Sequence, residues 1–459
     1  MLNPNTSVLP GLILAALVGL LGIHYELSQS MVVTAATASL CIFWWIFEPI
    51  PIPVTSLLPL ALMPMFGVLT PTQTGAAYGS PLILLLMGGF LLSRGMESTG
   101  AHKRVALGVI RLVGSESPRR LVLGFMISGA ALSMWISNTA TVLMLLPVAL
   151  AVLDSAEQKE RLAAPLLLGL AWSCSIGGMG TPIGTPPNLI FMQVYEDATG
   201  QAVGFVQWMS WGVPVVVTMI AVTALWLTRS LPTKLLVTLP ESTAWRSAEK
   251  RVLVVFGLTG LAWMTRSEPF GGWRELLGIP GANDASVAFL AVIVLFVLRD
   301  NEGTPLITWQ EAARIPWGVL LLFAGGICLA SAFVASGLSA VVGEALVILT
   351  TLPTYLMLLL ICLAVTFMTE ATSNTATTAL LMPILAAAAI AAGVEPAMLM
   401  VPAAMSASCA FMLPVATAPN AVIYGTDRIG ISTMFREGLL LNLVGAFVVS
   451  AGLWWLLPQ

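Results

Sequence analysis

The sequence predicts an all-α polytopic membrane protein, with about eleven transmembrane helices and two opposed re-entrant helical hairpins in an inverted-topology repeat. Three observations predict this fold class. The chain is 58% hydrophobic and only 9% charged, whereas soluble domains carry about 25% charged residues. Its basic residues cluster in a few segments between apolar stretches. The pentapeptide SNTAT occurs twice, each time in the middle of a long apolar stretch.

The N-terminal part of the chain predicts a retained first helix within residues 1–30, because no basic residue precedes it as in a cleaved signal peptide. Three further spans are predicted near 31–47, 54–69 and 80–98. The basic segment from Arg94 to Arg120 follows them, and the positive-inside rule makes it cytoplasmic. The N-terminus is therefore expected in the cytoplasm, and the chain in the inner (cytoplasmic) membrane of the cell.

The first repeat is predicted over residues 31–229. Within it, the segment 119–155 contains an apolar block, Leu121–Leu153, that has basic residues before and after it. A single crossing would place one of these basic ends outside, so we predict a re-entrant hairpin that enters from the cytoplasm. Its turn carries the first SNT motif. A broken helix is predicted over 163–192, because two consecutive prolines interrupt it.

The second repeat is predicted over residues 250–459, with a hairpin at 352–392 and a broken helix at 397–424. No Lys or Arg flanks this hairpin, so it is expected to enter from outside, and the C-terminus is expected outside. The remaining spans are predicted near 207–228, 251–267, 286–298, 317–335 and 438–457.

Three segments of the first half recur in the second half in the same order and at nearly the same separation. They are Leu84–Gly100 with Leu320–Gly337, Ser137–Pro147 with Ser373–Pro383, and Gly184–Asn188 with Ala416–Asn420. An odd number of predicted crossings lies between the copies, so their orientations are opposite. This is the plan of secondary transporters, in which interrupted helices build a site near the bilayer midplane.

The polar residues of the first hairpin turn can bind ions. Hydroxyl and amide oxygens of Ser137, Asn138 and Thr139 suit a hard cation, and their donors suit a carboxylate. Ser133 lies one helical turn earlier and would face the turn. The broken helix leaves carbonyls without partners, above all that of Gly184, which can complete a cation shell. The second half repeats this arrangement with Thr369, Thr372, Asn374 and Ala416.

No Lys or Arg lies near either hairpin turn in the sequence. A dianion at the midplane would be costly without positive charge. Bound cations can supply that charge, so cation and anion binding are expected to be coupled.

Other side chains have simpler interpretations. Glu370, beside the second turn, is either a proton site or a structural hydrogen-bonded carboxylate, and we favour the latter. His102 is expected to have a surface or interfacial role in the basic segment rather than to couple protons. The cysteines all fall in apolar stretches and are expected to be packing residues, without a disulfide framework.

On these motifs the chain resembles the divalent anion:sodium symporter family, the sodium-coupled dicarboxylate, citrate and sulfate transporters. The resemblance covers nearly the whole chain and rests on the doubled SNT, on GTPPN, on LPVATAPN and on GAHKRVAL. It implies a homodimer in which a transport domain moves against a scaffold domain like an elevator, with both domains built from interleaved segments.

The resemblance also implies roles for individual residues. The first sodium site would comprise Ser133, Ser137, Asn138 and Gly184; the second, Thr369, Thr372, Asn374 and Ala416. Substrate would contact Ser137, Asn138, Thr139, Thr185, Ser373, Asn374, Thr375, Thr417 and Ala418. Here the second motif is TAPN, with Ala418 where the family often has proline, which alters the wall that faces the substrate.

The sequence therefore predicts sodium-driven import of a C4-dicarboxylate such as succinate. Sodium is the expected coupling ion, and neither an organic cofactor nor a nucleic-acid partner is expected. The alternatives within the fold are a sulfate or tricarboxylate carrier and a sodium-independent anion exchanger. A channel is disfavoured by two opposed closed hairpins. An enzyme is disfavoured because no nucleophile–base pair or metal cluster lies at one membrane depth.

Overall fold

The computed structural model is built of α-helices and describes residues 4–114, 117–156, 158–232, 244–266, 271–341 and 352–457. Within these residues, the only β-type pairing is an isolated bridge between Arg299 and Pro305. In the same part of the chain, nine helices are long and apolar enough to cross a membrane. The predicted all-α membrane fold class is confirmed, while the number of crossings stays a prediction.

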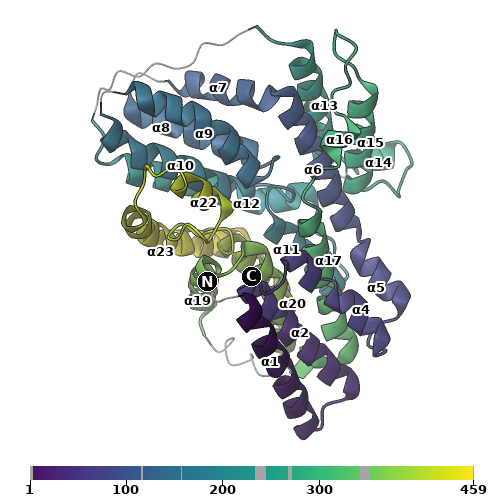
Figure 1. Cartoon of the computed structure of the whole chain (residues 1–459). Helices are drawn as coiled ribbons and strands as arrows, with labels where there is room; N and C mark the ends of the chain where they lie inside the picture. Colours follow the sequence, from purple (N-terminus) through teal and green to yellow (C-terminus); the bar gives the residue numbers. More distant parts are fainter. Residues whose placement is uncertain are drawn as a thin grey trace.

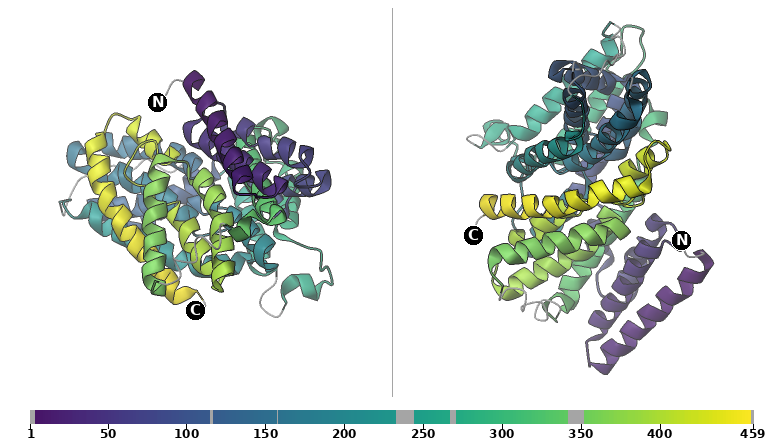
Figure 2. Two further views of the ribbon diagram at one scale, coloured as in Figure 1. Left: turned by 90° about the horizontal axis from the view of Figure 1, so that it is seen from below. Right: turned by 90° about the vertical axis from the view of Figure 1, so that its left-hand side faces the viewer.

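The N-terminal region begins with a pair of packed helices, which Figure 2 shows at one side of the molecule. The predicted span near 54–69 is divided into two short helices, α3 and α4. Prolines lie in the first turns of α4, α5 and α6, where the missing N–H costs no hydrogen bond. The helices are α1 (Pro4–His24), α2 (Gln29–Phe47), α3 (Ile52–Thr55), α4 (Leu58–Met65), α5 (Pro71–Tyr78) and α6 (Pro81–Thr99).

The rest of the first half contains the two interruptions that the sequence predicts. One lies at 134–137, between α8 and α9, and the other at 179–185, between α10 and α11. The helices are α7 (Ala101–Val113), α8 (Pro118–Ser133), α9 (Asn138–Ser155), α10 (Lys159–Gly178), α11 (Pro186–Thr199) and α12 (Phe205–Thr228).

The second half has matching interruptions, at 372–373 and at 407–417. Its helices are α13 (Ser247–Met264), α14 (Gly272–Leu276), α15 (Asp284–Val297), α16 (Trp309–Ala312), α17 (Trp317–Ser336), α19 (Thr354–Ala371), α20 (Asn374–Ala392), α21 (Pro396–Ser406), α22 (Ala418–Tyr424) and α23 (Ile431–Leu456). The helical boundaries agree with both predicted hairpins, although their re-entrant course through a membrane stays a prediction.

The two halves exchange the second parts of their broken helices. Helix α11, from the first half, packs against α20 of the second half. In return, α22 of the second half packs against α9 and α10 of the first, as Figure 1 shows at the left of the molecule. The interruption of each broken helix stays at the turn of its own half, where Thr181 donates to the Met134 carbonyl and Thr369 contacts the Ala407 carbonyl.

Helix α7 connects two groups of helices. It runs from the end of α6, which packs against α13 and α15, toward α8 in the other group (Figure 1). The corner between α6 and α7 is Gly100, whose φ of 76° lies in the left-handed region that glycine adopts without strain.

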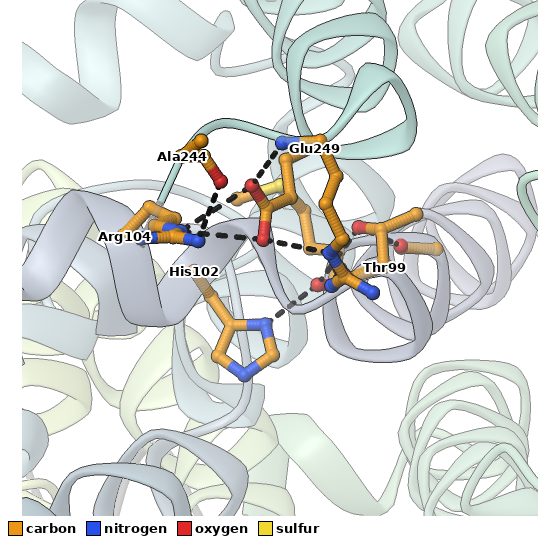
Figure 3. Close-up of polar contacts among 8 residues, drawn as sticks. Thr99, His102, Arg104, Ala244 and Glu249 are labelled. Carbon is orange, nitrogen blue, oxygen red and sulfur yellow. Dashed lines mark hydrogen bonds and ion pairs between the residues drawn. The ribbon is translucent and has the colours of Figure 1, made fainter. Parts of the chain in front are cut away.

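Polar contacts hold this corner against the start of α13 (Figure 3). The Nδ1–H of His102 donates to the carbonyl of Met96 at 2.6 Å, and the Arg246 guanidinium donates to the carbonyl of Thr99. Glu249 accepts from Arg104 at 3.3 Å and from Arg246 at 3.1 Å. The expected surface role of His102 is wrong, because its side chain is buried.

Candidate functional site

Each SNT motif begins a helix. The Ser137 hydroxyl accepts a hydrogen bond from the amide of Ala140 (3.2 Å) and caps α9. In the same way, Ser373 accepts from Ala376 (3.1 Å) and caps α20. Serine is a preferred N-cap because its hydroxyl satisfies an otherwise unpaired amide. Both motifs therefore present the positive end of a helix dipole.

The asparagine of each motif bonds to the helix that precedes it. Asn138 accepts from the Ser133 hydroxyl at 2.5 Å. Asn374 accepts from the Thr369 hydroxyl at 2.9 Å, and Thr369 also contacts the Ala407 carbonyl at 3.0 Å. Equivalent positions of the two halves thus make the same bond across each turn. Ser133 and Thr369 are fully buried, so their hydroxyls support the asparagines from behind.

The broken helices are also held alike in the two halves. Asn188 donates to the carbonyls of Gly178 (2.9 Å) and Thr181 (2.7 Å). Asn420 donates to the carbonyls of Ala410 (3.1 Å) and Leu413 (3.0 Å), which are the equivalent positions. In both halves, the amide group bridges the interruption and fixes the path of its backbone.

A cavity of about 1080 Å³ brings the two turns and the two interruptions together. The predicted residues that line it are Ser137, Asn138, Thr139, Gly184, Thr185, Thr372, Ser373, Asn374, Thr375, Ala416, Thr417 and Ala418. Ser133 and Thr369 do not line it and lie behind their asparagines. Segments from both halves of the chain thus form a single concave site, the usual form of a small-molecule site.

The electrostatics of the cavity agree with the absence of basic residues near the turns. Among the described residues that line it, Glu48 is the one charged side chain. Glu48 ends α2 in the left-handed conformation, with φ 46°. Sequence reasoning missed this residue, although an acidic side chain directly after the apolar run CIFWWIF was a visible signal. An anion in this cavity has no cationic side chain to meet on its described walls.

The groups around the first turn suit a hard cation. A Cβ on Gly178 would lie 2.8 Å from Oδ1 of Asn138 and 3.2 Å from the carbonyl oxygen of Gly184, so these two oxygens flank the same glycine. Hydroxyl, amide and carbonyl oxygens are the ligands that hard cations prefer. In addition, Oδ1 of Asn188 and Oδ1 of Asn420 are buried and accept no hydrogen bond within the described part of the chain.

The second turn differs at Thr372. Its hydroxyl donates to the Met368 carbonyl at 3.0 Å and also bonds to Thr377. Ile136 occupies the equivalent position of the first half and has no hydroxyl. The backbones of the two turns therefore follow similar paths, but the second turn has a hydroxyl oxygen that the first turn lacks.

Glu370 organises the interruption of the second broken helix. Its carboxylate accepts from three consecutive amides, those of Phe411 (2.7 Å), Met412 (2.8 Å) and Leu413 (2.9 Å). The side-chain amide of Asn442 donates to it as well, at 2.7 Å. Each of these four donors thus has an acceptor. These contacts agree with the favoured interpretation of Glu370 as a structural carboxylate.

Trp135 is a second cavity residue that sequence reasoning missed. It precedes the first turn and stacks on Trp263 of α13, with ring centroids 6.2 Å apart. It also stacks on Phe205 of α12 at 6.0 Å. These partners are far from Trp135 in the sequence, so no local sequence pattern predicts the contact. The equivalent residue of the second half is Ala371, which leaves that turn without a ring.

Comparisons with known proteins agree with this architecture. The sequence matches the citrate transporter family, CitMHS, over residues 42–401. It is 37% identical to the sodium-dependent dicarboxylate transporter SdcS of Staphylococcus saprophyticus, over 99% of this chain and 92% of that protein. SdcS of Staphylococcus aureus strain MRSA252 gives the same identity and coverage.

A likeness to a solved structure agrees with the fold. This structure is the YdaH transporter of Alcanivorax borkumensis, with a TM-score of 0.59 and 15% identity, and the match covers 86% of this chain and 89% of that one. The relatives are transporters, and so is this protein rather than an enzyme. On its motifs and on these matches, the chain belongs to the divalent anion:sodium symporter family.

Proposed function

We propose that this protein imports C4-dicarboxylates such as succinate, driven by a sodium gradient. The observation that carries the proposal is the single cavity in which both SNT turns meet both interrupted helices. Its described walls offer hydroxyl and amide groups but no cationic side chain. A doubly charged anion therefore needs positive charge from bound ions, which makes its binding depend on sodium. The names of the SdcS relatives support both the ion and the substrate class.

In this proposal, one sodium ion binds at each of the two turns. The first site comprises Ser133, Ser137, Asn138 and Gly184; the second, Thr369, Thr372, Asn374 and Ala416. The substrate carboxylates contact the two SNT turns together with Thr185, Thr417 and Ala418. Both helix N-termini contribute partial positive charge toward the anion.

Transport then takes place by alternating access of the elevator type. The helices that carry the turns and interruptions move as one unit against the remaining helices, and α7 is one of the connections between the two sets. The protein works as a homodimer in the inner membrane, with its N-terminus in the cytoplasm and its C-terminus outside. Inverted repeats that build a site near the bilayer midplane from interrupted helices are typical of secondary transporters that work by alternating access.

The test is uptake of radiolabelled succinate into proteoliposomes, with and without an inward sodium gradient. We expect accumulation only with the gradient, and competition by malate and fumarate. Stronger competition by citrate or sulfate would instead assign the protein to the tricarboxylate or sulfate carriers. Uptake that depends on internal anion and ignores sodium would identify an exchanger and contradict the proposed coupling.

A further inference from the structure

A groove of about 310 Å³ lies between α12 and α23, away from the central cavity. Apolar side chains form most of its walls, and Arg229 closes one end. The residues that line it are Val222, Leu225, Trp226, Arg229, Leu440, Leu441 and Val444. Leu225 is 74% exposed, so this surface is open to whatever surrounds the two helices.

Positive charge gathers at one end of the groove. The Arg229 guanidinium lies 3.6 Å from the ring centroid of Trp226 and forms an ion pair with Glu437 at 2.8 Å. Arg436 pairs with the same carboxylate at 3.2 Å. Two guanidinium groups thus share one carboxylate, which leaves about one unit of positive charge. The side chain of Arg436 is 77% exposed and can meet a further anion.

Along both helices, the arginines lie at one end of the groove and the apolar residues extend away from them. On α12 the apolar residues from Val222 precede Arg229, and on α23 Arg436 precedes the apolar residues up to Val444. The apolar part of α23 beyond Arg436 extends for about 12 Å at 1.5 Å per residue. The groove therefore has a cationic end and an apolar length, both on helices that are apolar enough to span a membrane.

We propose that this groove binds an acidic phospholipid, with an acyl chain along α12 and α23 and the phosphate at Arg436 and Arg229. Guanidinium groups bind phosphate oxygens with two parallel hydrogen bonds. The ring of Trp226 supports Arg229 at the level where aromatic residues meet lipid headgroups. A free phosphate would use only the charged end and leave the apolar groove unoccupied, so the complete surface fits a lipid better than a soluble anion.

Native mass spectrometry of the purified full-length protein tests this site. The probes are phosphatidylglycerol, phosphatidylcholine and inorganic phosphate, each added to delipidated protein. We expect wild type to retain phosphatidylglycerol in preference to the other two. R436Q should bind it about fivefold more weakly, because a basic residue near a lipid surface contributes about 1 kcal/mol. Glu437 keeps Arg229 as its partner in this variant, so no buried charge is left unpaired.

A second variant and a control separate the lipid from general effects. V444W fills the apolar part of the groove without touching the charges, and it should reduce phosphatidylglycerol retention as R436Q does. R428Q removes an exposed arginine that pairs with Asp154 outside the groove, and it should retain lipid like wild type. Equal retention of the two lipids, or unchanged retention in both groove variants, would overturn the proposal. The proposal would also be overturned if V444W changed only the oligomeric state of the protein, because the groove would then hold a second copy of this chain.

Discussion

At the scale of single residues, the two halves repeat individual hydrogen bonds as well as sequence motifs. Ser133 bonds to Asn138 as Thr369 bonds to Asn374, although serine is replaced by threonine. The sequence predicted that Ser133 faces the first turn and that the second half repeats the arrangement, because the motif is doubled and a helical turn brings the earlier hydroxyl near. It did not predict that Asn188 would bridge two carbonyls, since those acceptors lie inside an irregular loop that no periodic pattern describes.

Asn138→Ala and Asn374→Ala test the proposed sodium sites. Each change removes an amide oxygen from the cavity wall, so we expect the sodium concentration for half-maximal succinate uptake to rise at least tenfold, roughly the loss seen when metal sites lose supporting groups. Asn301→Ala is the control, because Asn301 is exposed and contacts Arg251 outside the cavity. Wild-type sodium dependence in both cavity variants would refute the assignment.

Glu370→Gln separates the two interpretations of this carboxylate. An amide nitrogen cannot accept a hydrogen bond, so the variant keeps an acceptor for the amides of Phe411 and Met412 but leaves the Leu413 amide, which bonds to the other carboxylate oxygen, unsatisfied. We expect unfolding to become easier by about 1–3 kcal/mol, measured as a lower thermal midpoint in detergent. Glu302→Gln, in an exposed loop, should leave the midpoint unchanged. If Glu370 were instead a proton site, the variant would keep its stability and lose the pH dependence of uptake.

At the scale of elements, the sequence predicted helix ends well where a local signal marks them. Both SNT serines cap helices, and prolines lie in the first turns of α11 and α22. It could not predict which elements would meet. Arg246 and Thr99 are 147 positions apart, yet they bond at the corner of α6 and α7. His102 is buried for the same reason, because its environment comes from the packing of distant segments.

The contacts at this corner make a pH-dependent contribution to stability. Burial alone would raise the pKa of Glu249, but hydrogen bonds from Arg246 and Arg104 outweigh it and lower the pKa. The contribution is therefore complete above the ordinary glutamate pKa of about 4.3 and is lost as pH falls through the lowered value. We expect E249Q to lower the thermal midpoint at pH 7 and to reduce the further loss on acidification to about pH 3. Parallel pH profiles of variant and wild type would argue against this role.

At the scale of the whole molecule, α11 and α22 each pack against the other half and so join the two turns into a single body. Neither hairpin can move alone without pulling the other half's broken helix away from it. Motion is then expected where this body meets the remaining helices. One such contact is between Gly89 of α6 and Ile183 of the first interruption. A Cβ on Gly89 would lie 3.7 Å from the Cβ of Ile183, within the range of about 3.5–4.5 Å found in disulfides.

The double variant G89C/I183C therefore tests alternating access directly. Oxidation should join α6 to the first interruption and stop succinate uptake, because the two bodies can no longer move past each other. Reduction should restore it. The single variants control for the new side chains and for the native cysteines. These are Cys41, Cys174, Cys328, Cys362 and Cys409, which are all buried and form no disulfide. Continued uptake with the crosslink formed, confirmed by a mass shift of the crosslinked peptides, would mean that substrate passes without this movement, as through a channel.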